Sequence, residues 1–288
     1  MILYVNDIFD VYNIEKTQLN INAVKGLVAA LKSKDLCSYE KQKLNFNGEV
    51  FIYCWKIYLR FLDFFDPNYN RITDFSSFFK YIIDSLLYGN KMNFFALFCP
   101  GYTKYGYKEY LGDTTKCKLE RLNNLKGLLS QLEIPSSITC CYSEVFLENT
   151  NYDLEPNWEK QLEFNKSLFH EEGEKYFDSQ YVKNLSEVSV FSSSGDLEGY
   201  VSNEIIDSLP PRTYAAFKKS NEKFYKSLNF TEEQIQFRND RLITMYRILS
   251  DYLNSLDNTV FLPMENMYER ENIFSENNTC TMYLNLKK

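Results

Sequence analysis

The stretch 93–147 constrains the fold of this chain more than any other. It opens with a largely apolar run at 93–99, closed by Pro100, and it ends with a second largely apolar run at 138–147. Short apolar runs of this kind are typical of strands that are buried on both faces of a sheet. Two such strands, with enough chain between them for a helix, predict a βαβ unit with parallel strands.

Between the two runs the sequence predicts one loop and one helix. The loop at 100–113 is rich in Tyr, Gly and Lys. Thr114 or Thr115 can then cap a helix that reaches about Leu132, because leucines recur along it at three- and four-residue steps. Ligands of βαβ units usually bind at the carboxyl ends of the strands, which is where this loop and residues 143–149 are expected.

Helices dominate the rest of the predicted structure. Residues 1–90 form a mainly helical N-terminal segment ahead of a core at 91–288. Within the core we expect helices at 158–177, from Pro211 onward, and from a capping box that starts at Thr231. No shift in composition marks a linker, so the segment and the core could also form one continuous domain.

Three further strands are expected, at 188–191, 259–263 and 280–286. Strands that alternate with helices place the chain in the α/β class. We therefore predict a Rossmann-like mixed sheet with flanking helices.

Charge and cysteine usage exclude several classes of protein. The 288 residues carry a net charge of −7, which argues against a large phosphate-backbone footprint, so nucleic acid is not an expected partner. Seven cysteines without CxxC spacing predict a reduced, cytoplasmic protein without a disulfide framework. Neither a signal-peptide pattern nor an apolar run of membrane-spanning length is visible, and we expect no membrane partner.

The motifs do not indicate a metal or a cofactor. His170 is the only histidine, and we expect it at an exposed helix end, where it would be a surface residue. The sequence has no zinc-ligand spacing, no Walker A motif and no GxGxxG. We predict neither a metal nor a cofactor, and the oligomeric state stays open.

The loop at 100–113 holds the strongest catalytic candidates, Lys104 and Lys108. They follow a strand end and precede a helix N-terminus, whose free N–H groups attract anions. A lysine can bind a phosphate there, or attack a carbonyl if it is desolvated. Tyr102 and Tyr107 lie beside them as candidate substrate-binding residues. The alternative is a solvent-exposed lysine loop with tyrosines packed beneath it.

Polar residues also follow two other apolar strands. Ser143 and Glu144 end the second strand, where Ser143 could bind a substrate amine or hydroxyl and Glu144 could act in catalysis. Glu265 and Asn266 come directly after the strand at 259–263 and are candidate substrate-binding residues. Alternatively, the first pair are ordinary polar positions of an alternating strand, and the second pair belong to a surface loop.

Arg238 and Arg241 stand three residues apart at the start of the long helix that Thr231 caps, so they project from one side of it. Two arginines in that arrangement suit bidentate capture of a carboxylate or a phosphate. The alternative is a surface ion pair with Glu232 or Glu233.

The order of these features resembles the core of the isocyanide synthases and their dityrosine-biosynthesis relatives. In that family an apolar strand leads to a proline–aromatic–lysine loop, a second lysine, a Leu-Gly pair, an acidic residue and an amphipathic helix. The corresponding residues here are Pro100, Tyr102, Lys104, Lys108, Leu111, Gly112 and Asp113, followed in the next strand by Ser143, Glu144, Val145 and Phe146. Arg238 and Asn239 match an Arg-Asn helix near the family's C-terminus.

The resemblance implies a Rossmann-like biosynthetic enzyme that converts the amine of an amino acid to an isonitrile, with a pentulose phosphate as carbon donor. Lys104 and Lys108 would then meet the sugar phosphate or its carbonyl, and Arg238 or Arg241 the carboxylate. The expected partners are therefore small molecules, an amino acid and a sugar phosphate.

Two alternatives remain open. The architecture is also similar to that of tRNA-dependent cyclodipeptide synthases, in which case a tRNA would bind. The signature serine that follows the first strand in that family is missing here, and Thr103 is the nearest hydroxyl. The second alternative is a non-enzymatic interaction module whose aromatic surface serves a protein partner.

Overall fold

The computed structural model describes residues 61, 64–65, 77–78, 81–82, 84–85, 89–98, 102–103, 106–107, 113–146, 158–192, 209–226, 229–264, 273–274 and 277–284. Most of the expected helical segment 1–90 lies outside these residues, so the division of the chain near residue 90 stays a prediction. No helix in the described part of the chain is long and apolar enough to cross a membrane.

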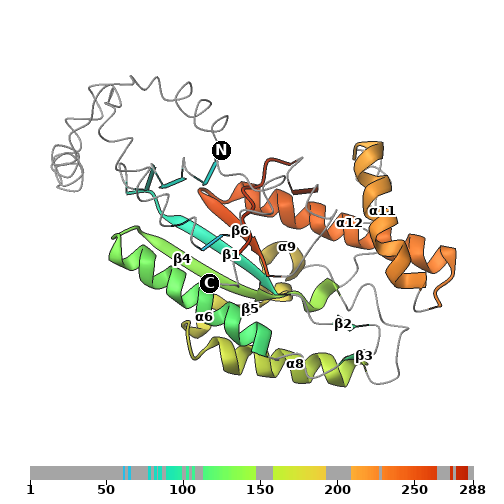
Figure 1. Cartoon of the computed structure of the whole chain (residues 1–288), viewed down its shortest axis with the longest axis horizontal. Coiled ribbons are helices and arrows are strands. Elements are labelled where there is room, and N and C mark those ends of the chain that lie inside the picture. Colours follow the sequence, from blue (N-terminus) through green and yellow to red (C-terminus); the bar gives the residue numbers. More distant parts are fainter. Residues whose placement is uncertain are drawn as a thin grey trace.

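Four parallel strands form the centre of the molecule, in the order β5-β4-β1-β6 (Figure 1). Their bounds are Met92–Phe98 for β1, Ser136–Tyr142 for β4, Val182–Asn184 for β5 and Thr259–Pro263 for β6. The α/β class is confirmed. A mixed sheet was expected, but the four described strands all run parallel to one another.

Helices cover both faces of this sheet (Figure 1). One face carries α6 (Asp113–Gln131) and α8 (Trp158–Gly173), and the other carries α9 (Ser189–Ser192), α11 (Pro211–Lys226) and α12 (Glu232–Ser255). Each face has its own cluster of buried apolar side chains. The sheet is therefore the middle layer of three.

The alternation of side chains along the strands explains the two clusters. Phe94 in β1 packs in the cluster under α6 and α8, whereas Phe95 packs in the cluster under α12. Cys140 and Cys141 in β4 divide between the two clusters in the same way. Apolar residues at consecutive positions are needed because both faces are buried.

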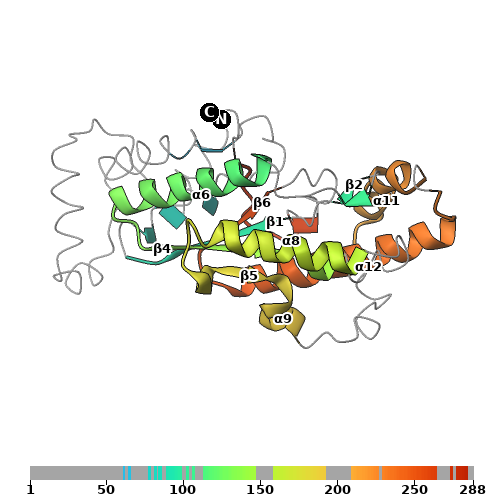
Figure 2. The same cartoon turned by 90° about the horizontal axis from the view of Figure 1, so that it is seen from below.

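Successive strands are added first on one side of β1 and then on the other. The chain runs from β1 through α6 to β4, as the βαβ prediction has it, and then through α8 to β5 on the same side. From β5 it returns through α9, α11 and α12 to β6, on the far side of β1. The strand order therefore reverses between β1 and β6. The carboxyl ends of all four strands lie at one edge, on the side where α6 and α8 begin (Figures 1 and 2).

Two strand predictions were wrong. Residues 188–191 were expected as a strand, but α9 begins at Ser189, and the strand lies earlier, at β5. The pattern missed β5 because it is only three residues long and becomes a strand by pairing with β4. Within 277–284, where a last strand was expected, the structure has isolated bridges at Thr281 and Leu284.

The second strand of the βαβ unit is shorter than predicted. It ends at Tyr142, and residues 144–146 form a helical turn where the strand was expected to continue. The long helix α12 agrees with its prediction, because Thr231 and Gln234 form the expected capping box. The Gln234 backbone N–H donates to Thr231 Oγ1 at 3.2 Å, and the Thr231 backbone N–H donates to Gln234 Oε1 at 2.9 Å.

Gly173 ends α8 where it packs against β5. A Cβ added at this glycine would lie 2.8 Å from Val182 Cγ1 and 3.2 Å from Val182 Cγ2. We expect Gly173→Ala to lower the free energy of unfolding by about 1–3 kcal/mol, because the Val182 side chain must move. Denaturant unfolding of the purified protein measures this.

Two further variants make the prediction specific. The double variant with Val182→Ala should be no less stable than Val182→Ala alone, because the clash is gone. Gly127→Ala is the matched control on α6, where a Cβ would meet nothing within 4 Å, and it should stabilise the helix by about 0.5–1 kcal/mol. Equal effects of the two glycine substitutions would contradict the close packing at Gly173.

Candidate functional site

Only some of the predicted site residues belong to the described part of the chain. Lys104, Lys108, Glu265 and Asn266 lie outside the described residues, so their roles stay predictions. Tyr102 and Tyr107 are described in their backbone alone. They pair with each other in the two-stranded antiparallel ladder of β2 (Tyr102–Thr103) and β3 (Gly106–Tyr107), which follows β1.

Ser143 joins the carboxyl ends of β1 and β4. Its backbone N–H and its Oγ both donate to the carbonyl oxygen of Phe98, at 2.9 Å and 2.8 Å. The residue is buried, and its hydroxyl binds the last carbonyl of β1. In this arrangement Ser143 fixes the two strand ends relative to each other.

Glu144 is fully buried directly after Ser143. Its Oε2 accepts the Leu185 N–H at 2.9 Å, and its Oε1 accepts the Ser186 N–H at 2.8 Å and the Ser186 hydroxyl at 2.5 Å. These donors belong to the 3-10 turn η3 (Leu185–Glu187) that follows β5. The carboxylate therefore ties the end of β4 to the end of β5, and a catalytic role would require these bonds to break.

Arg238 is only 1% exposed. Its guanidinium carbon lies 4.0 Å from the centre of the Phe230 ring and 6.0 Å from that of Tyr225, and Nη1 donates to the Gln234 carbonyl at 3.3 Å. A surface ion pair was the alternative in the sequence, but this side chain lies inside the joint between α11 and α12.

Arg241 lies over a different ring, that of Phe237, at 4.2 Å from its centre. The two guanidinium groups therefore rest on separate aromatic residues. Arg238 also stands well beyond the strand ends. Tyr246 packs against Phe146 near the end of β4, and Arg238 is two turns earlier on α12, about 12 Å along the helix axis.

His170 is half-buried on α8, where an exposed helix end was expected. Its Nε2 lies 3.1 Å from Oδ1 of Asn184, the last residue of β5. The helix turns this side chain toward the sheet edge, and the sequence alone could not show which face of α8 packs on β5.

The two cysteines of β4 are poor nucleophiles. Burial raises the pKa of the Cys140 and Cys141 thiols well above the usual range, and nearby Glu144 adds to the rise at Cys141. Both thiols therefore stay protonated at neutral pH. Among the described residues no group of three His, Cys, Asp or Glu side chains is placed to hold a metal ion.

A polar network joins α11 to α12. The Tyr214 hydroxyl donates to Asp240 Oδ1 at 2.9 Å, the Gln236 amide donates to Tyr214 and to both Asp240 oxygens, and Lys218 Nζ donates to Gln236 Oε1 at 2.9 Å. Burial is the largest cause that raises the pKa of Tyr214, and the Asp240 carboxylate adds to it. The phenol is thus held in its protonated form, as a donor to Asp240.

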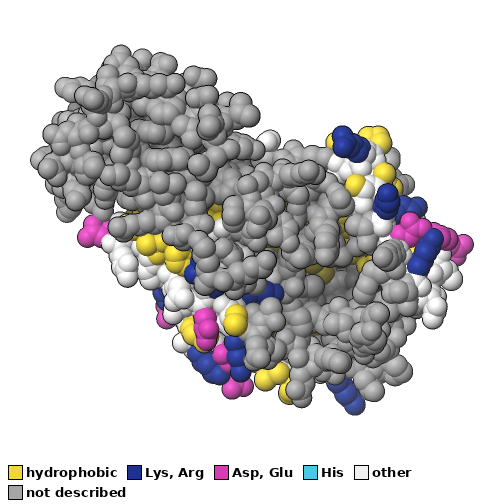
Figure 3. All heavy atoms as spheres, in the orientation of Figure 1, with side chains coloured by type: hydrophobic (Ala, Val, Ile, Leu, Met, Phe, Trp, Pro, Cys, Tyr) yellow, Lys and Arg dark blue, Asp and Glu magenta, His cyan; other side chains and the backbone are white. Residues whose placement is uncertain are grey.

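Lys and Arg side chains lie over α11 on the face drawn in Figure 3, with Asp and Glu side chains close beside them. Lys226 at the end of α11 pairs with Glu222 at 2.5 Å and with Glu232 at 3.0 Å. The acidic neighbours offset part of the positive charge on this surface.

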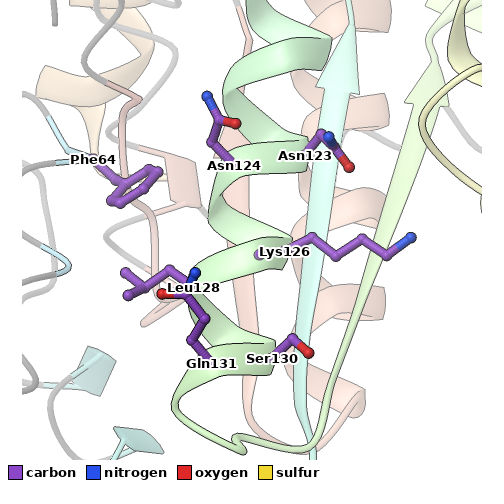
Figure 4. Close-up of a pocket in the computed structure, with 8 residues that line it drawn as sticks. Phe64, Asn123, Asn124, Lys126, Leu128, Ser130 and Gln131 are labelled. Atoms are coloured by element: carbon purple, nitrogen blue, oxygen red, sulfur yellow. The ribbon is translucent and has the colours of Figure 1, made fainter.

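A pocket of about 600 Å³ lies along the second half of α6, away from the carboxyl edge (Figure 4). Phe64 faces the helix across it, and the rest of its lining is Asn123, Asn124, Lys126, Gly127, Leu128, Ser130 and Gln131. Lys126 is the one charged group among the described residues of the lining, and it donates to the Tyr176 carbonyl at 3.5 Å. These described side chains include no carboxylate and no thiol, so they contain no acid–base pair.

One residue at the carboxyl edge was not predicted from the sequence as a site residue. Asn165 on α8 is fully buried, in register with the core residues Leu162 and Phe169. Its only signal in the sequence is an amide at a position of the helix where an apolar residue would be expected.

No family model matches the sequence, and no curated protein matches it. Among solved structures, the crystal structure of the PvcA (PA2254) protein from Pseudomonas aeruginosa is similar, with a TM-score of 0.49 and 11% sequence identity. The match covers 80% of this chain and 83% of that chain. A similarity at this level carries no argument about activity, and the assignment of the fold rests on the strand order itself.

Proposed function

We propose that this protein is a small-molecule biosynthetic enzyme that acts on an amino-acid-like substrate at the carboxyl edge of its sheet. The observation that carries the proposal is the reversal of strand order between β1 and β6. In open α/β sheets ligands bind in the crevice outside the carboxyl ends of the strands at such a point. Both the chain that follows β1 and the chain that follows β6 leave the sheet there.

The sequences of these two segments supply suitable chemistry. Lys104 and Lys108 follow β1 and precede the N-terminus of α6, so they add positive charge where a phosphate or carboxylate would bind. Glu265 and Asn266 follow β6, and their oxygens can accept hydrogen bonds from an ammonium group or a hydroxyl. An amino acid and a sugar phosphate carry these complementary groups.

The finer proposal is isonitrile formation from the amine of the amino acid, with a sugar phosphate as carbon donor. It is supported by the resemblance of residues 93–147 to the isocyanide synthases. Lys104 and Lys108 would hold the phosphate or the carbonyl of the sugar. Of the two arginines, the half-buried Arg241 is the better candidate for an anionic group of the substrates, because Arg238 is packed inside the joint of α11 and α12.

The test compares metabolites from cells that express the wild type with those from cells that express Lys104→Ala. We expect a new nitrogen-containing metabolite with the wild type, its loss in Lys104→Ala, and nearly equal melting temperatures of the two purified proteins. Lys219→Ala, at an exposed lysine of α11, is the matched control and should leave the metabolite in place.

Identical metabolite profiles from folded wild type and Lys104→Ala would overturn the role of Lys104. A tRNA-dependent transferase would instead copurify with nucleic acid that high salt removes, because phosphate contacts weaken steeply with salt.

A further inference from the structure

Asn165 is a buried amide whose hydrogen bonds are not made within the described protein. Its side chain is fully inaccessible to solvent, and neither Oδ1 nor Nδ2 has a partner among the described residues. Buried polar side chains are nearly always hydrogen-bonded, because an unpaired one loses its bonds to water without replacement. A leucine at this position would avoid that loss, so the amide itself calls for an explanation.

Asn165 lies just beyond the carboxyl ends of β1 and β4. One turn later on α8, the Phe169 ring packs against Phe98, with ring centres 5.0 Å apart, and against Tyr142, at 5.3 Å. Phe98 and Tyr142 are the last residues of their strands. Asn165 is therefore about 6 Å nearer the start of α8 than these ring contacts, past the strand ends.

Asn165 is also level with the first turn of α6. The two helices run in the same direction on one face of the sheet (Figures 1 and 2). Tyr176, just after α8, meets the middle of α6, since its hydroxyl donates to Glu120 at 3.3 Å and its carbonyl accepts from Lys126 at 3.5 Å. Counting back along both helices from this contact pairs Asn165 with the start of α6 near Asp113.

The ligand that fits this place must supply both an acceptor and a donor. The amide of Asn165 offers N–H donors at Nδ2 and an acceptor at Oδ1. An α-amino acid carries a carboxylate that accepts and an ammonium that donates, whereas the dianionic phosphate group of a monoester carries no donor and would leave Oδ1 unpaired. The N-terminus of α6 favours the carboxylate, because its free N–H groups and the helix dipole attract negative charge.

We propose that Asn165 and the N-terminus of α6 together bind the head group, carboxylate and ammonium, of an α-amino acid. This inference rests on the proposed function and names the subsite for its amino-acid substrate. Lys104 and Lys108 then remain for the second substrate.

Calorimetry on the full-length protein tests the inference directly. The twenty L-α-amino acids are titrated into the wild type and into Asn165→Leu, which keeps the branched shape of the side chain and removes both hydrogen-bonding atoms. We expect at least one amino acid to bind the wild type and to bind Asn165→Leu about ten- to a hundredfold more weakly. Asn165→Leu should also melt at a higher temperature than the wild type, which verifies that it is folded.

Asn165→Asp tests the direction of the bonds. Aspartate keeps an acceptor and loses the N–H donors. The Asn165→Asp variant should therefore still bind the decarboxylated analogue of the bound amino acid, which has the amine and lacks the carboxylate. It should lose affinity for the acid that lacks the amine. Ser167→Ala, at an exposed position two residues along α8, is the control and should bind all three compounds like the wild type.

The outcomes separate the inference from the proposed function. Unchanged affinity in a well-folded Asn165→Leu would overturn the inference, and the amide would then bind only a buried water, while the enzyme proposal would stand. Failure of the wild type to bind any amino acid would overturn both. The Lys104→Ala metabolite experiment reports on the proposed function independently of Asn165.

Discussion

Replacing Glu144 with alanine should lower the free energy of unfolding by about 3–5 kcal/mol, the larger of the two strongest effects that we expect. The substitution removes a buried carboxylate that accepts three hydrogen bonds from Leu185 and Ser186. Hydrogen bonds to a charged acceptor are stronger than those between neutral groups. Without the carboxylate its donors would be unpaired, and one of them, the N–H of Leu185, belongs to a buried residue. Denaturant unfolding of the two purified proteins measures the difference.

Glu187→Ala provides a matched control in the same turn. Glu187 is exposed, and its Oε1 accepts one bond, from the Asn184 N–H at 2.9 Å. Water can replace that bond, so the control should lose much less stability than Glu144→Ala. If instead Glu144→Ala is as stable as Glu187→Ala, the carboxylate does not hold the strand ends together and the catalytic interpretation of Glu144 gains weight.

Replacing Arg238 with alanine is expected to cost about 2–4 kcal/mol. The guanidinium group stacks on Phe230 inside the joint between α11 and α12, and its aliphatic stem fills buried volume. Alanine loses both the cation–π contact and the packing. Arg238→Met, which keeps most of the length, should recover part of the loss, and thermal or denaturant unfolding measures each variant.

Arg241→Ala is the control for this pair. Arg241 is half-buried, and the ring under it, Phe237, is 37% exposed, so its removal should cost much less stability. Should Arg238→Ala prove as stable as Arg241→Ala and yet fail to bind the substrate carboxylate, the packing role would be wrong and the capture of a carboxylate would be supported.

Local patterns in the sequence were enough for several elements. β1 and β6 are largely apolar runs, and β6 was predicted with the bounds that the structure has. The start of α12 was predicted as well, because its capping box is formed by Thr231 and Gln234 within one turn. In each case the interactions that define the element join residues close together in the chain.

Long-range contacts decided what the sequence missed. β5 is too short to show a pattern in the sequence and forms a strand by pairing with β4. The order of the four strands depends on the side of the sheet to which the chain returns after β5. The same limit applies to the site. Nothing near Glu144 in the sequence indicates that its partners lie 41 and 42 residues away, at Leu185 and Ser186.

The sequence by itself therefore determined the α/β class, the βαβ unit and the loops that leave its strands. Only the tertiary structure decided what the polar side chains beside those loops do. In the structure Ser143 and Glu144 form hydrogen bonds that join the strand ends. Arg238 packs between helices, and the amide of Asn165 lies at the carboxyl edge without a partner among the described residues. The physical reason is that residue type sets which bonds a side chain can form, whereas burial and neighbours from distant segments set which bonds it does form.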